Sequence, residues 1–203
     1  MRLDSQPMGT EGKVKPASNL PLLRRLEAVS LVLAAVAMMA NFVGLILVAG
    51  GAVVTFWAVS AMLLAVFAAL RLVFWRTARS SDTTFLTGSV KLLRGVSAFA
   101  VGLSCCLAAL TDSSATYRAL DPAGANGCRA VVREHSFLFS GGGSVYAARF
   151  GIGLRASSWT TDDGYEPVAS GAYRLEWGGD SGVLELIGGI DPVWPSVHTI
   201  PCN

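Results

Sequence analysis

The sequence predicts a membrane protein with three transmembrane helices, followed by a small all-β extracytoplasmic domain that is an antiparallel sheet or sandwich with one disulfide. Three observations support this fold class. Residues 28–70 contain no Asp, Glu, Lys or Arg, and hydrophobic residues make up 52% of the whole chain, well above the balance of a soluble domain. Basic residues gather beside the apolar runs. Beyond them, the hydrophobic pattern alternates as in β-strands.

The uncharged run of 43 residues is too long for one membrane helix. At about 1.5 Å per residue it would form a rod of roughly 65 Å, about twice the hydrocarbon thickness of a bilayer. Gly50 and Gly51 lie near its midpoint, where a reversing chain needs residues that tolerate unusual backbone angles. We therefore expect a transmembrane helical hairpin over residues 26–75, with helices at 26–49 and 53–75.

Residues 1–25 form a short polar segment that contains three prolines, and we expect a disordered cytoplasmic tail. Arg24 and Arg25 before an apolar run also resemble the start of a signal peptide, including a twin-arginine signal. However, the run exceeds the ~7 to 15 residues of a secretory apolar region, and no small-x-small cleavage site ends it. A retained first helix is the better interpretation.

The second helix ends beside Trp75 and Arg76, a combination typical of an anchor at the headgroup level. A polar loop, residues 76–91, follows it. The third helix is expected at 92–112, although its uncharged part is at the lower edge of what spans a bilayer. Arg94 can extend this helix by reaching toward the headgroups.

Charge predicts the orientation. Residues 1–27 and 71–94, which are the tail, the loop and the helix ends beside them, hold ten of the 16 basic residues, against four acids. The chain after Thr111 holds six arginines against ten acids, a net charge of −4. The positive-inside rule then predicts a multi-pass protein of the cell membrane, with the N-terminus cytoplasmic and the C-terminus extracytoplasmic. The ten basic residues are Arg2, Lys13, Lys15, Arg24, Arg25, Arg71, Arg76, Arg79, Lys91 and Arg94.

Cysteine placement agrees with this orientation. Cys128 and Cys202 lie near the two ends of the outer region, and a bond between them is stable outside the cytoplasm. We expect a linker at 113–127 and a disulfide-closed β-domain at 128–203. Cys105 and Cys106 fall within the third helix, where packing is a simpler explanation than lipid modification.

Small residues four positions apart predict how the helices pack. Ala98 and Gly102 form such a ridge on the third helix, and Ala40 and Gly44 form one on the first. Asn41 is the one strongly polar side chain of the long apolar run, and a buried amide in lipid needs a partner. Ser97 or Ser104 would supply one, so we expect Asn41 to join helices rather than to serve transport.

The outer region shows strands and glycine turns. Residues 146–155 alternate between apolar and other side chains, which predicts a strand with one solvated face. We expect turns at residues 141–143 and 178–182, each closing an antiparallel hairpin. Together these hairpins favour a small antiparallel sheet or sandwich.

Little in the outer region points to chemistry. Residues 179–182 resemble the run around the nucleophilic serine of chymotrypsin-like proteases, with His135 upstream and Ser181 as the nucleophile. The region is less than half the size of that fold, and a hairpin turn explains the glycines. His135 and His198 lack further ligands at metal-binding spacing. We therefore expect no enzyme, cofactor or metal site, and no nucleic-acid partner, because the outer region is acidic.

A surface on the β-domain is the candidate for partner binding. Trp159, Tyr165 and Trp194 would form a platform for a glycan or peptide, although such side chains in a small sheet more often belong to the core. Asp162, Asp163 and Glu166 form a solvated turn or, as the alternative, a calcium site. Two functions remain open: an envelope component that binds a partner protein or envelope component, and a membrane sensor that signals through its cytoplasmic loop. The bilayer and other membrane or envelope proteins are the expected partners. The candidate surface comprises Trp159, Asp162, Asp163 and Tyr165.

Overall fold

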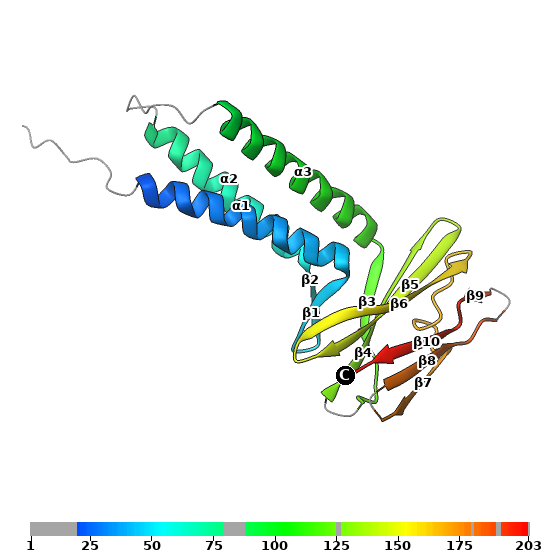
Figure 1. Ribbon diagram of the computed structural model, residues 1–203. Coiled ribbons are helices and arrows are strands. Elements are labelled where there is room, and N and C mark those ends of the chain that lie inside the picture. The colour runs from blue at the N-terminus through cyan, green and yellow to red at the C-terminus, as the bar shows by residue number, and fades with distance from the viewer. Residues whose placement is uncertain (1–19, 79–87, 125–126, 180, 190–191, 203) are drawn as a thin grey trace, which may run out of the picture.

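In the described part of the chain, three helices form a bundle with a β-domain at one end of it (Figure 1). Three helices are long and apolar enough to cross a membrane, and their outward faces carry exposed apolar side chains such as Val36, Met62 and Phe99. The helices are α1 (Leu20–Val43), α2 (Phe56–Ala78) and α3 (Gly88–Asp112). The computed structural model describes residues 20–78, 88–124, 127–179, 181–189 and 192–202.

The start of α1, the end of α2 and the start of α3 lie at the bundle end opposite the β-domain (Figure 1). This is the arrangement expected if the tail and the polar loop share one side of the membrane. Most of the predicted cytoplasmic tail, 1–25, and of the predicted loop, 76–91, lies outside the described residues.

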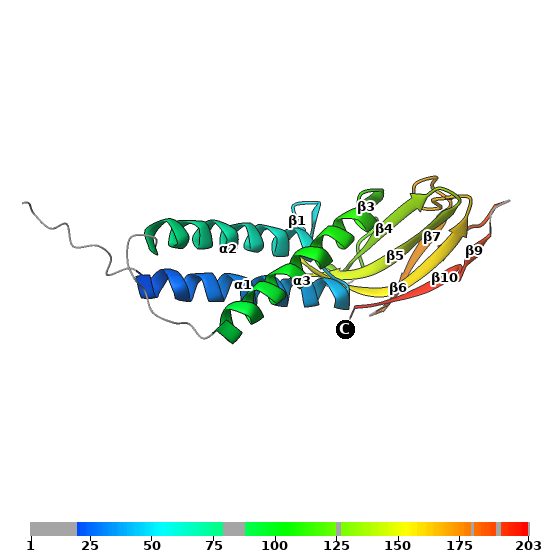
Figure 2. The same ribbon diagram turned by 90° about the horizontal axis from the view of Figure 1, so that it is seen from above.

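The helices pack through small and weakly polar side chains. The Ser60 hydroxyl donates a hydrogen bond to the Ala34 carbonyl oxygen (2.8 Å) and joins α2 to α1. Helix α3 crosses this pair obliquely (Figure 2), and the buried Cys105 Sγ lies 3.4 Å from Ser60 Oγ. Gly102 of the predicted ridge makes no close contact, because a Cβ there would meet nothing within 4 Å.

The tip of the helical hairpin is a β-hairpin, which the sequence interpretation missed. Helix α1 ends at Val43 rather than at residue 49, because Gly44 adopts a φ of +84° that L-residues avoid. Strands β1 (Leu45–Ala49) and β2 (Ala52–Thr55) follow. Gly50 and Gly51 do reverse the chain, but as the turn of this hairpin, with φ values of 58° and 86°.

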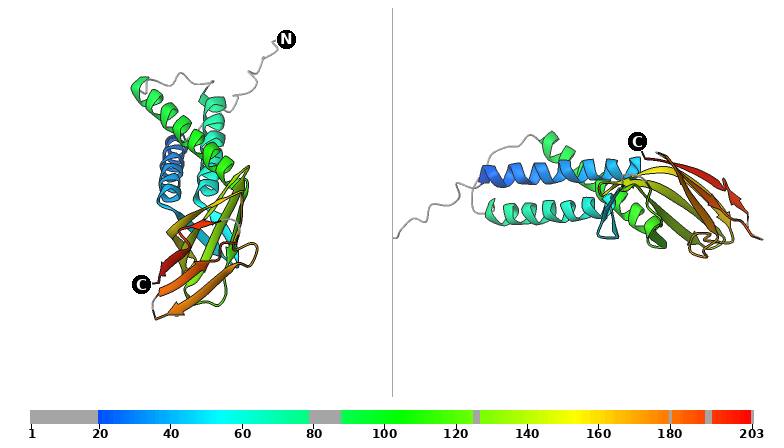
Figure 3. Two further views of the ribbon diagram at one scale, coloured as in Figure 1. Left: turned by 90° about the vertical axis from the view of Figure 1, so that its right-hand side faces the viewer. Right: turned by 90° about the horizontal axis from the view of Figure 1, so that it is seen from below.

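Ten strands form two sheets in the described part of the chain. One sheet has the order β2-β1-β6-β5-β4-β3, with β9 also paired to β6, and the other has the order β10-β8-β7. Figure 3 shows both sheets beyond the ends of the helices. The remaining strands are β3 (Ala115–Ala119), β4 (Arg129–Phe137), β5 (Ser140–Arg149), β6 (Ile152–Asp162), β7 (Tyr173–Gly178), β8 (Ser181–Leu186), β9 (Val193–Trp194) and β10 (Val197–Pro201).

The larger sheet includes segments expected elsewhere. Strand β1 pairs with β6, Leu47 opposite Ile152, so the segment between α1 and α2 belongs to the domain's sheet. Strand β3 lies within the expected linker 113–127 and pairs with β4 from Ala115 opposite His135. The β-domain therefore combines strands that precede α2 in the sequence with strands that follow α3.

Two turns differ from the sequence prediction. The glycines at 141–143 lie inside β5 rather than in a turn. The side chains of Thr161 and Trp159 occupy the space where Cβ atoms at Gly141 and Gly143 would stand. The turn lies before them, where Leu138 has a positive φ. The predicted single strand 146–155 is a hairpin that turns at Phe150 and Gly151.

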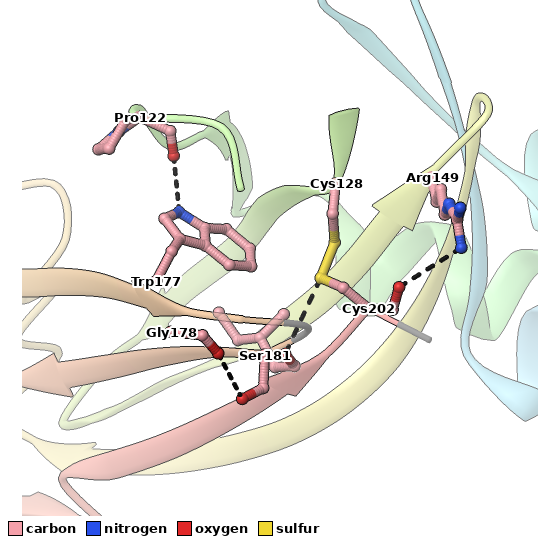
Figure 4. Close-up of a disulfide and its surroundings, with 8 residues drawn as sticks. Pro122, Cys128, Arg149, Trp177, Gly178, Ser181 and Cys202 are labelled. Atoms are coloured by element: carbon pink, nitrogen blue, oxygen red, sulfur yellow. Dashed lines mark hydrogen bonds between the residues drawn. A yellow bond between two sulfur atoms is a disulfide. The ribbon is translucent and has the colours of Figure 1, made fainter. Parts of the chain in front are cut away.

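The disulfide Cys128–Cys202 is present, as predicted. It joins the residue before β4 to the residue after β10, and so connects the two sheets (Figure 4). A buried core between the sheets contains both cysteines, with Val132, Leu184 and Ile200 among its members. On the opposite face of the larger sheet, a smaller cluster around Ile46 and Tyr146 is turned toward the helices.

Candidate binding site between the helices and the β-domain

A cavity of about 660 Å³ lies where the helix ends meet the larger sheet. Each helix contributes to its wall: Asn41 from α1, Trp57 from α2 and Asp112 from α3. Strands β4 and β6 contribute Arg133 and Arg155. Its volume is in the range of pockets that hold small ligands or side chains, and it exists only because the bundle and the sheet lie together.

Asp112, the last residue of α3, is the centre of a hydrogen-bond network. Its Oδ2 accepts a hydrogen bond from the Trp57 indole N–H (2.9 Å). Its Oδ1 accepts one from the Tyr117 hydroxyl (2.8 Å) and one from Arg133 Nε (2.8 Å). One carboxylate thus joins α2, α3 and two strands of the sheet.

Arg133 also binds a backbone carbonyl oxygen at the C-terminal end of α3. Its second guanidinium nitrogen donates to the Thr111 carbonyl oxygen at 2.8 Å, one of the carbonyl groups that a helix leaves unpaired at its C-terminus. A cation at this position also interacts favourably with the helix dipole. This offsets the unfavourable position of the Asp112 carboxylate at the same terminus.

The pKa values of the two tyrosines and the histidine of the wall are shifted in the directions that favour their neutral forms. Burial, with the hydrogen bond to Asp112, raises the pKa of Tyr117, and burial raises the pKa of Tyr146. Burial and the neighbouring Arg133 lower the pKa of His135. Burial alone would lower the pKa of Arg133, but the hydrogen bond to Asp112 raises it above its ordinary value.

Arg155 is the cation of the cavity that has no counter-ion. It is exposed and has no ion pair or side-chain hydrogen bond among the described residues, whereas Arg133 is neutralised by Asp112. Its backbone N–H donates to the Gly44 carbonyl oxygen (3.0 Å), which fixes β6 against the end of α1. The cavity therefore offers a net positive charge beside neutral hydroxyl, imidazole and amide groups.

Asn41 joins two helices, although not through the predicted serines. Its Oδ1 accepts a hydrogen bond from the backbone N–H of Trp57 (3.3 Å), in the first turn of α2. This acceptor satisfies one of the free N–H groups of that terminus. Ser104 instead donates to the Ala100 carbonyl oxygen of its own helix.

An exposed apolar tip adjoins the cavity. Phe137 lines the cavity and is 70% exposed, and the β4–β5 turn places Leu138 and Phe139 beside it, 76% and 82% exposed. We call residues 137–139 the apolar tip. The Asp163 backbone N–H donates to the Phe139 carbonyl oxygen (3.0 Å), so the exposed acidic residues of the β6 end lie next to the tip.

The predicted partner surface is divided by the fold. Asp162 and Asp163 are exposed beside the apolar tip. Trp159, in contrast, is 3% exposed and lies in the core, where its ring centroid is 5.2 Å from that of His198. Its strand alternation turns it inward, so it is not part of an outer surface. Tyr165 packs partly against the same core.

His135 and Ser181, the pair that resembles a protease site, lie in different sheets. Ser181 is in β8 of the smaller sheet, and its hydroxyl donates to the Gly178 carbonyl oxygen (3.4 Å), near Trp177 and the disulfide (Figure 4). His135 is in β4 of the larger sheet and lies 3.4 Å from an Arg133 nitrogen. Asp180 lies outside the described residues. Among the described residues, no three His, Cys, Asp or Glu side chains gather as a metal site would require.

Sequence reasoning missed most of this cavity. Asp112 ends the third apolar run, but nothing in the sequence pairs it with Arg133, 21 residues later, or with Trp57, 55 residues earlier. A charge at the end of a transmembrane run was the single available signal. Comparison of the chain with protein families, with curated proteins and with solved structures gave no match.

Proposed function

We propose that this protein is a non-catalytic component of the cell envelope that holds a disulfide-closed β-domain against the outer face of the cell membrane and there binds a partner protein or envelope component. The positive-inside rule supports this orientation. The disulfide supports it independently, because such bonds persist in oxidising compartments.

The cavity between bundle and sheet is the observation that carries the proposal. The β1–β2 hairpin belongs to the sheet, and the Asp112 network joins the helix ends to it. These contacts join the domain to the end of the helical bundle, which supports a position at the membrane surface rather than on a free linker. A partner that inserts an anionic or hydrogen-bonding group would meet Arg155, while its apolar side chains would cover Phe137 and Phe139. This favours a membrane-proximal segment of another envelope protein as the partner.

Photocrosslinking in intact cells tests this assignment. A photoreactive phenylalanine analogue is placed at Phe139, and a matched one is placed at Val197, which is 57% exposed on β10 of the other sheet. We expect one discrete adduct from position 139, and its loss when Arg155→Ala is added. Equal adducts from both positions, or none from position 139, would contradict the proposal.

A sensor is the second candidate, and one observation favours it. The outer ends of all three helices line the cavity, so a bound ligand would bias their relative positions and the cytoplasmic loop at 76–91. Replacing that loop by a neutral linker separates the candidates. An envelope component would keep both its adduct and its cellular role, whereas a sensor would keep the adduct and lose the role.

A further inference from the structure

A second cavity, of about 510 Å³, lies between the helices at the bundle end opposite the β-domain. One part of its wall is apolar and includes Ala68, Leu72 and Trp75 of α2. The other part is strongly charged, with residues from all three helices. These charged residues are Arg24, Glu27, Arg71, Lys91 and Arg94. We call this cavity the basic pocket.

The one carboxylate of the basic pocket is already paired. Glu27 is 3% exposed, and its Oε1 lies 2.9 Å from a guanidinium nitrogen of Arg71. This ion pair joins α1 to α2 and leaves both groups neutralised. Arg24, Lys91 and Arg94 have no ion pair with any described residue. Three positive charges therefore face one space without a counter-ion.

Arg24 carries the clearest sign of a missing partner. Its guanidinium carbon lies 5.0 Å from the centre of the Phe74 ring, a cation–π contact that holds the group in place. Its Nε is buried and has no hydrogen-bond partner among the described residues. A buried donor without an acceptor is costly. An acceptor brought by a ligand would remove that cost.

Phosphate is the group that suits this arrangement. Guanidinium groups bind phosphate oxygens through paired, charge-assisted hydrogen bonds, and a lysine adds a compact charge. The pocket also lies at a helix end marked by Trp75 and Arg76, where headgroups are expected. Its apolar wall along α2 would lie beside acyl chains. Basic pockets between transmembrane helices are known to hold anionic headgroups.

We propose that the basic pocket binds the headgroup phosphate of an anionic membrane lipid. Arg24, Lys91 and Arg94 contact the phosphate, while the Glu27–Arg71 pair keeps α1 and α2 in place. Because the ligand contacts α1 and α3, it bridges the oblique third helix to the other two. This site is separate from the cavity beside the β-domain and does not depend on that cavity's function.

Thermal unfolding of the full chain in neutral detergent tests the proposal. Dioctanoyl phosphatidylglycerol should raise the melting temperature in a saturable way, whereas dioctanoyl phosphatidylcholine should leave it unchanged. Each removed cation should weaken binding about fivefold, so Lys91→Gln with Arg94→Gln should raise the Kd about 25-fold. The matched control, Arg25→Gln with Arg76→Gln, removes two exposed charges from the same end that do not line the pocket.

Equal weakening in both double variants would overturn the proposal, because the effect would then be general surface charge. Sodium phosphate supplies the free ion: if it alone reproduces the stabilisation and abolishes that by the lipid, the lipid assignment is wrong. Native mass spectrometry of the unaltered chain, released from mixed micelles of both lipids, does not depend on how the variants fold. One retained phosphatidylglycerol supports the site, and equal retention of the two lipids overturns it.

Discussion

Asp112 is the residue on which the junction between bundle and β-domain depends most. Its side chain and that of Arg133 are only 12% and 16% exposed, at an N–O distance of 2.8 Å. Breaking such a pair from one side leaves the other charge without compensation. Two further donors, the Trp57 indole N–H and the Tyr117 hydroxyl, also depend on the Asp112 carboxylate as their acceptor.

We therefore expect Asp112→Asn to lower the free energy of unfolding by about 3 kcal/mol. Adding Arg133→Gln should recover part of this loss, because the uncompensated cation is then gone. The control is Glu176→Gln, which breaks the exposed Arg174–Glu176 pair at 4.0 Å and should cost less than about 0.5 kcal/mol. Chemical unfolding in detergent measures all three variants, and equal losses for Asp112→Asn and Glu176→Gln would refute the role of the network.

His198 makes the stability of the β-domain depend on pH. The residue is buried, its Nδ1 lies 2.8 Å from Ser157 Oγ, and burial lowers its pKa. The unfolded chain, with an ordinary histidine pKa near 6.5, binds a proton before the folded chain does. Folding stability should therefore be complete above pH 6.5 and fall as the pH decreases toward the lowered folded pKa.

The variant His198→Gln keeps a hydrogen-bonding group near Ser157 but cannot titrate. Its melting temperature should change less than that of the parent between pH 7.5 and 5.5. The opposite shift of Glu134, whose pKa burial raises, is present in both proteins and cancels in the comparison. Parallel pH profiles would show that His198 is not the group responsible.

At the scale of elements, Gly44 decides where the first helix stops and the sheet begins. Its φ is +84°, and a Cβ there would stand 2.8 Å from the Arg155 Cβ. Gly50 has a φ of +58° but would meet nothing within 4 Å. Substitutions at both positions would strain the backbone, but only one at Gly44 would also create a steric contact, so comparing the two separates these effects.

Gly44→Ala should destabilise the protein by clearly more than Gly50→Ala. Each substitution costs roughly 1–2 kcal/mol, because it forces an L-residue into a left-handed conformation. Gly44→Ala must also displace Arg155 from the wall of the cavity. Unfolding in detergent gives the two losses, and crosslinking at Phe139 reports whether the cavity survives. A larger loss for Gly50→Ala would contradict this account of the junction.

The same region shows what sequence patterns predict and what they leave out. Three apolar helices and a disulfide-closed β region follow from hydropathy, charge and cysteine placement. The β1–β2 hairpin does not, because Leu, Ile and Val at 45–48 suit a membrane helix as well as a strand. The sheet pairing of Leu47 with Ile152 decides between them, and that contact spans more than one hundred residues.

Glycine misled the prediction for a similar reason. At 141–143 it allows Trp159 and Thr161 to approach the strand closely, a role that looks identical to a turn in sequence. On α3, Gly102 has open space beside it, and the helix instead contacts its neighbours through Cys105. Local composition gives the permitted backbone shapes, and distant side chains select among them.

At the scale of the whole molecule, the disulfide and the charge pattern both bear on which side of the membrane the β-domain faces. The bond closes a separation of 74 residues, which corresponds to roughly 4 kcal/mol in the chain-entropy account. The disulfide stabilises the domain only in a compartment that keeps it oxidised. The positive-inside rule predicts that this compartment lies opposite the basic end of the bundle.

Single-cysteine labelling in intact cells tests this orientation. In a Cys105→Ala, Cys106→Ala background, Ser170→Cys should react with a membrane-impermeant thiol reagent, because Ser170 is exposed on the β-domain. Ser81→Cys should react only after the membrane is permeabilised. Without reductant the purified protein should migrate faster in denaturing gels, because the closed loop compacts the unfolded chain. If Ser81→Cys reacts in intact cells and Ser170→Cys does not, the β-domain is cytoplasmic and its disulfide would be reduced there. The cavity beside the β-domain would then face partners inside the cell, and the basic pocket would meet the opposite leaflet.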